Sequence, residues 1–101
     1  MEGLHAGLLG DLGAEGQAEH DAARLAALRE QRMLLRGILD EVGLASGLVA
    51  ATDPGESWRS AAQREYIERL QELAGDLRGA ARKLEAALDA VHASIATLTG
   101  R

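Results

Sequence analysis

Cysteine and phenylalanine are absent from this 101-residue sequence, and it holds one Trp, one Tyr and one Pro. Without Cys the chain forms no disulfide framework and no thiolate metal site. Because large aromatic side chains are almost missing, the apolar content consists mainly of Ala, Leu, Val and Ile, which suits long packed helices better than a globular core. A chain of this length buries only a modest fraction of its surface by itself, so a lone compact core is marginal.

Long apolar runs and a surplus of positive charge are also lacking. No stretch reaches the roughly 18 apolar residues of a membrane-spanning helix, so no membrane insertion is expected. The opening residues MEGLHAGLLGDLGAEG lack the cationic start of a secretory signal, and export needs a signal-peptide-independent route. Sixteen acidic residues against eleven basic ones give a net charge of −5, which disfavours binding to nucleic acid or anionic membranes.

Catalytic and cofactor motifs are missing as well. The three histidines, His5, His20 and His92, are far apart in the sequence and form no metal-ligand pair at helical spacing. No serine has a Gly-x-Ser-x-Gly setting, and the N-terminal glycines do not form a phosphate-binding loop. We therefore predict no catalytic, cofactor-binding or metal site, and a protein that is not an enzyme.

The first part of the chain divides into a tail and a helix. Five glycines within residues 1–16 predict a flexible Gly-rich tail, although Leu4, Leu8 and Leu12 share one helical face. From about 17 to 50 apolar residues recur at steps of three and four, which predicts a helix. These residues are Leu25, Leu28, Leu35, Ile38, Leu39, Val42 and Val49. The polar pair Gln31 and Arg32 interrupts the stripe, either as an imperfection of a surface helix or as a polar contact to a partner.

Five unbroken heptads predict a second helix over about 57–98. One line of the repeat holds Leu70, Leu77, Leu84, Val91 and Leu98, and the other holds Ile67, Ala74, Ala81, Leu88 and Ile95. A third apolar line holds Tyr66, Leu73, Ala80 and Ala87. A two-stranded coiled coil needs only two such lines, so the wider face favours a helical bundle.

Residues 51–57 form the predicted turn, because they contain the only proline. Asp53, Pro54 and Glu56 form a helix-start signal, with Ser57 as a rival cap before Trp58. So short a link makes the helices antiparallel, and residues 17–98 form one helical hairpin. A lone hairpin leaves part of its apolar faces uncovered, so this all-α chain is expected to form a four-helix bundle on dimerisation. The predicted partner interface consists of Leu28, Leu35, Val42, Leu70, Leu73, Leu77, Leu84, Leu88 and Val91.

The turn carries a family resemblance. Trp58 lies at the bend, Ser60 follows two residues later, and Tyr66 is the aromatic residue eight positions after Trp58. Over residues 18 to 98 the sequence resembles the WXG family of small helical-hairpin proteins handled by bacterial type VII secretion systems. It departs from that family at Ser60, where the motif has Gly. It also has no Tyr followed four residues later by Asp or Glu after the second helix.

The resemblance implies a partner or substrate of a type VII secretion system. Such a protein pairs with itself, with another helical hairpin or with the helical N-terminal domain of a tail-bearing effector. The pair then presents the turn that contains Trp58 for export. It is cytoplasmic before export and then secreted or associated with the cell envelope. Two other functions stay open, namely a self-associating cytoplasmic adaptor or structural protein and a helical partner that neutralises a toxin.

Overall fold

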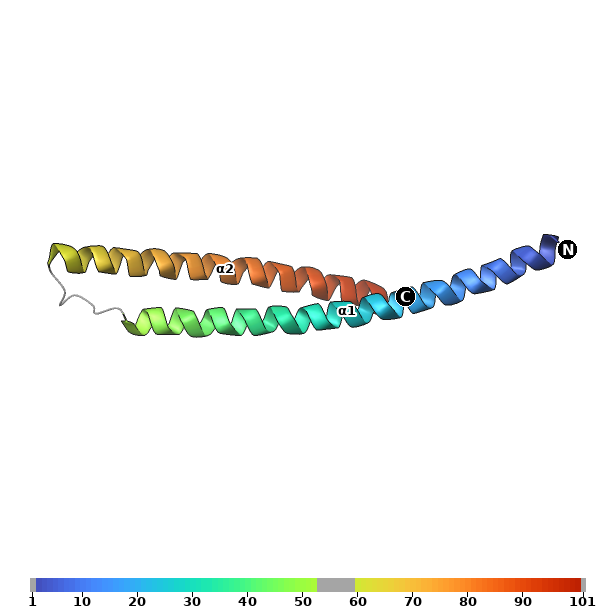
Figure 1. Cartoon of the computed structure of the whole chain (residues 1–101), viewed down its shortest axis with the longest axis horizontal. Helices are drawn as coiled ribbons and strands as arrows, with labels where there is room; N and C mark the ends of the chain where they lie inside the picture. Colours follow the sequence, from blue (N-terminus) through green and yellow to red (C-terminus); the bar gives the residue numbers. More distant parts are fainter. Residues whose placement is uncertain (1, 53–59, 101) are drawn as a thin grey trace.

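The chain is an all-α antiparallel helical hairpin, as the sequence predicted. The computed structural model describes the backbone of residues 2–52 and 60–100, and the side chains of residues 13–52 and 60–100. Helix α1 (Glu2–Thr52) and helix α2 (Ala61–Thr99) lie side by side over the full length of α2 apart from its first turns (Figure 1). The Cα atoms extend over 88 × 16 × 16 Å, so the hairpin is a slender rod.

Helix α1 begins far earlier than the sequence indicated. It is helical from Glu2, whereas residues 1–16 were predicted to form a flexible tail and the helix to start near residue 17. Each glycine costs about 1 kcal/mol relative to Ala, but adding a residue to an existing helix needs no new nucleus. The Ala, Leu, Glu and Gln residues between the glycines are good helix formers, so α1 propagates through this segment. Its N-terminal part extends past the end of α2 without a neighbouring helix (Figure 1).

Helix α2 begins later than predicted, and at a different cap. Ser60 is the N-cap: its side-chain oxygen accepts from the Gln63 backbone N–H at 3.2 Å, while the Ser60 N–H donates to Gln63 Oε1 at 2.9 Å. This reciprocal capping box satisfies two backbone donors at the helix start. The predicted cap residues Asp53 and Ser57 and the predicted first helical residue Trp58 lie outside the described residues, and helical structure resumes only at Ala61.

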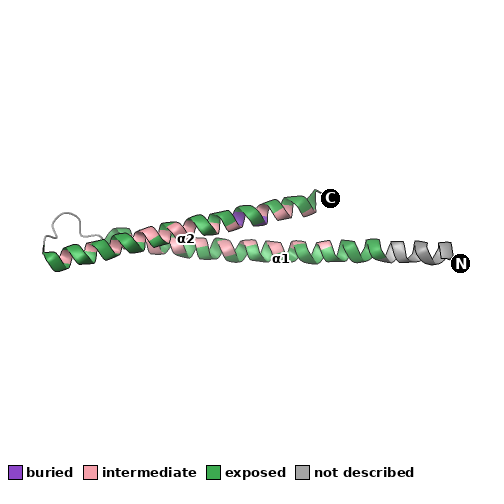
Figure 2. Cartoon of the chain, turned by 90° about the horizontal axis from the view of Figure 1, so that it is seen from above, coloured by how far each residue is buried: buried purple, intermediate pink, exposed green. Residues whose placement is uncertain are grey.

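Helix α2 packs against α1 through both heptad lines that the sequence indicated. All ten of those residues are half-buried or buried, and Leu88 and Val91, with 7% and 5% exposure, are the only buried residues in the described part of the chain. Helix α1 contributes half-buried residues at the same alternating steps of three and four. These are Leu25, Leu28, Arg32, Leu35, Leu39, Val42, Ser46 and Val49. Figure 2 shows this seam as a band of partly buried residues along the line where the helices meet.

One polar residue of the predicted stripe is part of the seam. Arg32 is half-buried at a seam position, whereas Gln31 beside it is exposed. Ile38, which the sequence placed on the same stripe, is 46% exposed and lies off the seam. The seam of α1 is therefore a strict heptad interrupted by Arg32 and Ser46, and a partner is not needed to explain the position of Arg32.

Candidate functional site

Several large apolar side chains of the hairpin remain exposed after the seam has formed. Leu44 and Leu48 near the end of α1 are 71% and 70% exposed, and Leu34 is 61% exposed. On α2, Leu73 and Tyr66 are also exposed. We call the group Leu34, Ile38, Leu44, Leu48, Tyr66 and Leu73 the apolar surface. Singly exposed leucines are ordinary, but six large apolar residues on one small hairpin indicate a binding surface.

The apolar surface lies mainly on one flank of the hairpin. The opposite flank is marked by Arg36 on α1 and His92 on α2, because Arg36 Nη2 lies 3.5 Å from His92 Nε2 across the seam. At about 100° per residue, Ile38 and Leu48 point to the other side of the α1 seam from Arg36. By the same count, Leu73 lies on the side of α2 opposite His92. The third apolar line of α2 therefore borders Leu34, Ile38 and Leu48 of α1.

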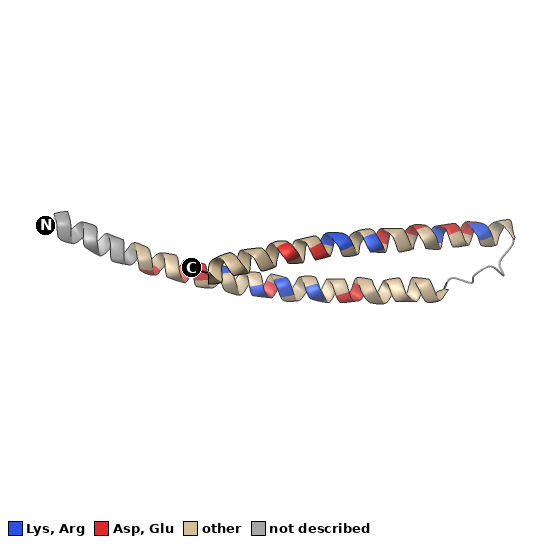
Figure 3. Ribbon diagram, turned by 180° about the vertical axis from the view of Figure 1, so that it is seen from behind, with Lys and Arg blue, Asp and Glu red and all other residues tan. Residues whose placement is uncertain are grey.

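The flank is narrow in the middle and bulky toward the turn. Ala45 of α1 and Ala80 and Ala87 of α2 are half-buried beside the seam and offer only methyl groups. Leu48 and Leu73 follow toward the turn. Residues 42–52 contain no charged side chain, so this end of α1 is uncharged on every side (Figure 3). Small residues allow a second helix to approach closely, and the bulkier leucines supply apolar contact area.

The solvent-accessible surface of the chain is larger than that of a compact monomer of the same mass. Its solvent-accessible surface of 7719 Å² exceeds by roughly 2,200 Å² the ~5,500 Å² expected for a compact monomer of this mass. Obligate protein interfaces bury on the order of 1,000–2,500 Å² per chain. The excess is thus of the size that an obligate helical partner removes.

The predicted partner-interface residues divide between the seam and the apolar surface. Within this chain the seam takes up eight of the nine, which are Leu28, Leu35, Val42, Leu70, Leu77, Leu84, Leu88 and Val91. Leu73 alone belongs to the apolar surface. Contact of any of them with a partner stays a prediction, but the surface left to make it differs from the predicted one. Sequence reasoning missed Leu34, Leu44 and Leu48, whose signal was that they are apolar residues off the heptad positions of α1.

The turn motif is only partly within the described residues. Ser60 caps α2, and Tyr66 lies in α2 and is 42% exposed. Trp58 lies outside the described residues, and its presentation at the turn stays a prediction.

The described side chains bring together no group suited to metal chemistry. Among residues 13–52 and 60–100, no three His, Asp or Glu side chains gather where they can hold a metal ion. Neither helix, over the residues described, has a segment apolar and long enough to span a membrane. What the described residues leave exposed is the apolar surface.

Comparisons of the chain with protein-family models, with curated proteins and with solved structures found no match.

Proposed function

We propose that this chain is a helical partner protein, whose hairpin is completed by a second helical element packed on the apolar surface. The observation that carries this proposal is the exposure of Leu34, Leu44, Leu48 and Leu73. In the described part of the chain only Leu88 and Val91 are buried. Removing such side chains from water is worth about 25 cal/mol per Å². A four-helix bundle is the economical arrangement for covering a hairpin of two long helices.

The form of this function that the WXG resemblance supports is a role in type VII secretion. The partner is then a second hairpin or the helical N-terminal domain of a tail-bearing effector. Pairing holds the turn around Trp58 ready for recognition. What supports this form is the order of helix, turn and helix together with the Trp58, Ser60 and Tyr66 spacing.

A pair of charge substitutions tests the role of the apolar surface. Leu48→Glu with Leu73→Glu places two carboxylates on the surface without touching the seam, so the hairpin keeps its helicity while partner binding is lost. The matched control is Ala50→Glu with Gln71→Glu, which adds the same charge. Both residues are exposed and line the same groove on the opposite flank of the hairpin. Co-purification with a tail-bearing helical protein encoded next to this chain is the readout.

The outcome separates the functions that the sequence left open. If only Leu48→Glu/Leu73→Glu abolishes both co-purification and export of the complex, the secretion role is supported. Binding without export points instead to an adaptor or a toxin-neutralising partner. Equal binding by both double variants contradicts the proposal that the apolar surface is the docking site.

A further inference from the structure

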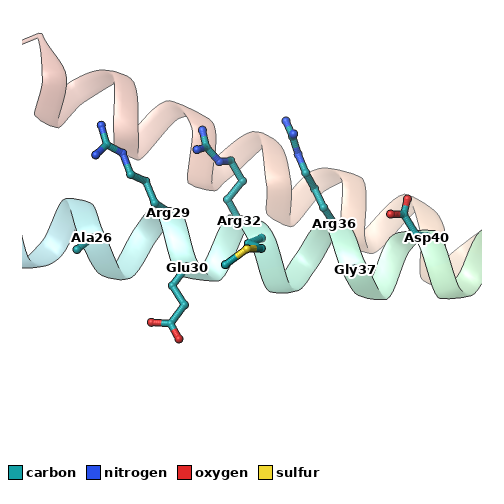
Figure 4. A pocket seen from close by; sticks show the side chains of 8 residues that line it. Ala26, Arg29, Glu30, Arg32, Arg36, Gly37 and Asp40 are labelled. Carbon is teal, nitrogen blue, oxygen red and sulfur yellow. The ribbon is translucent and has the colours of Figure 1, made fainter.

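A groove lined by arginines lies on the flank of α1 opposite the apolar surface. Three arginines, Arg29, Arg32 and Arg36, line it together with Met33 and two carboxylates, Glu30 and Asp40, and we call it the arginine groove. Figure 4 shows the Arg29, Arg32 and Arg36 side chains projecting from α1 in the same direction, while Glu30 points away from them. Met33 is 69% exposed, so the groove combines an exposed apolar side chain with an excess of arginines over carboxylates.

Within the described part of the chain, the arginines of this groove form no ion pair with a carboxylate. Arg29 and Arg32 make no hydrogen bond or ion pair among the described residues, and Arg36 meets the imidazole of His92. Three arginines against the carboxylates of Glu30 and Asp40 leave the groove positive on a chain with a net charge of −5, which favours an acidic occupant.

The chain itself carries acidic side chains on the part of α1 that extends past the end of α2. Residues 13–20 hold Glu15 and Glu19 and no Lys or Arg, and every one of them is exposed. No second helix lies beside this part of α1, which we call the N-terminal arm (Figure 1).

The arm and the arginine groove share one face of α1. Glu15, Glu19, Ala22, Ala26, Arg29, Met33 and Arg36 follow one another at steps of four and three residues, and all seven are exposed. Such spacing places them along a single helical line. The line is acidic before residue 24, has two alanines around that residue, and is basic after it. Glu19 and Arg29 lie five residues to either side of the centre.

From this arrangement we infer that a second copy of the chain occupies the arginine groove through its N-terminal arm. Two α1 helices cross antiparallel about a two-fold axis near residue 24, where Ala22 and Ala26 allow close approach. Glu19 then faces Arg29 of the other copy, and Glu15 lies opposite Met33, beside Arg36, twice over by symmetry. A parallel arrangement places like charges together and is disfavoured.

This arm exchange is independent of the apolar surface, because the two surfaces lie on opposite flanks of the hairpin. A chain paired through its arms still presents Leu48 and Leu73 to another partner. Two copies and two partners can therefore assemble together.

Charge reversal on either half of the line tests the inference. Variant one is Glu15→Arg/Glu19→Arg, and variant two is Arg29→Glu/Arg36→Glu, which leaves the seam residue Arg32 in place. Each variant alone puts like charges opposite each other, and we expect its self-association in about 0.05 M salt to weaken at least roughly tenfold. An equimolar mixture restores opposite charges at both contacts, so the dimer returns as a mixed species in sedimentation.

A crosslink gives a second readout that does not depend on stability. The natural chain has no cysteine, so Glu19→Cys/Arg29→Cys forms a disulfide only between copies, since ten helical residues separate the sites by about 15 Å within one chain. The matched control is Gln17→Cys/Gln31→Cys, whose sites are also symmetric about residue 24 but lie on the other face of α1.

The inference predicts a covalent dimer for Glu19→Cys/Arg29→Cys and little for the control. It is overturned if the two double variants self-associate as the natural chain does, if their mixture does not restore the dimer, or if both cysteine pairs crosslink equally. If Leu48→Glu/Leu73→Glu abolishes binding to the apolar surface while the Glu19→Cys/Arg29→Cys crosslink still forms, the apolar surface and the arm exchange are separate contacts.

Discussion

At the scale of single residues, Ser60 decides where α2 begins. The Ser60 hydroxyl accepts from the Gln63 backbone N–H, and the Gln63 side chain accepts from the Ser60 backbone N–H. Ser60 therefore caps the start of α2 at Ala61.

We expect Ser60→Ala to lower the free energy of unfolding by about 1 kcal/mol, and Ser60→Gly by only a few tenths. The reason is that Ala leaves the Gln63 N–H unsatisfied, while Gly lets water and the backbone compensate. Urea unfolding followed by circular dichroism measures both variants. A larger loss for Gly than for Ala is incompatible with a capping role for Ser60.

Burial of single residues gives a second contrast at this scale. Leu88→Ala is expected to destabilise the hairpin by about 2–3 kcal/mol, because it opens a cavity beside Val91 in the most buried part of the seam. Leu44→Ala, at a residue 71% exposed, is expected to change the free energy of unfolding by less than about 0.5 kcal/mol. Thermal unfolding of the two variants under one condition compares them. Similar losses at both sites contradict the placement of the seam.

At the scale of elements, α2 was the predictable helix. Its two heptad lines from Ile67 to Leu98 are unbroken, and the structure puts both against α1. Helix α1 was harder to predict because glycines, Arg32 and Ser46 interrupt its pattern, and Ile38 resembles a seam residue until a neighbouring helix fixes the register. Its start at Glu2 was missed because propensity counts each glycine separately, whereas helix growth is cooperative.

Most of the candidate site escaped prediction for a related reason. A heptad tells which residues face another helix, but not whether that helix belongs to the same chain. The sequence assigned Leu77 and Leu84 to a partner interface, and the structure packs them on α1. Of the predicted interface residues Leu73, on the third line, is exposed beside the seam, and its contact with a partner stays a prediction. Leu44 and Leu48 became visible as a surface once the seam was known.

Glycines within α1 predict an element-scale gain in stability. A Cβ added at Gly43 or Gly47 meets nothing within 4 Å, and both residues are exposed within a regular helix. Gly43→Ala and Gly47→Ala are each expected to raise the free energy of unfolding by about 0.5–1 kcal/mol. The control is Gly100→Ala, whose Cβ meets the Ala96 carbonyl oxygen at 3.1 Å and brings no such gain. Chemical unfolding that shows no gain at Gly43 and Gly47 contradicts a continuous α1.

At the scale of the whole molecule, the hairpin has two flanks of different chemistry. One flank carries the apolar surface, and the other carries the arginine groove with its excess of arginines. The exposed area exceeds that of a compact monomer by roughly 2,200 Å², which two helices in one layer cannot remove by themselves. Our proposal that the hairpin is one layer of a larger helical assembly rests on this excess.

The solution mass of the purified chain tests this claim most directly, measured by light scattering together with circular dichroism. We predict a helical species of at least twice 10.6 kDa, whose mass falls toward 10.6 kDa as dilution separates the chains while the hairpin stays helical. A monodisperse 10.6 kDa monomer at every concentration, with thermal stability unaffected by Leu48→Glu/Leu73→Glu, would contradict this prediction.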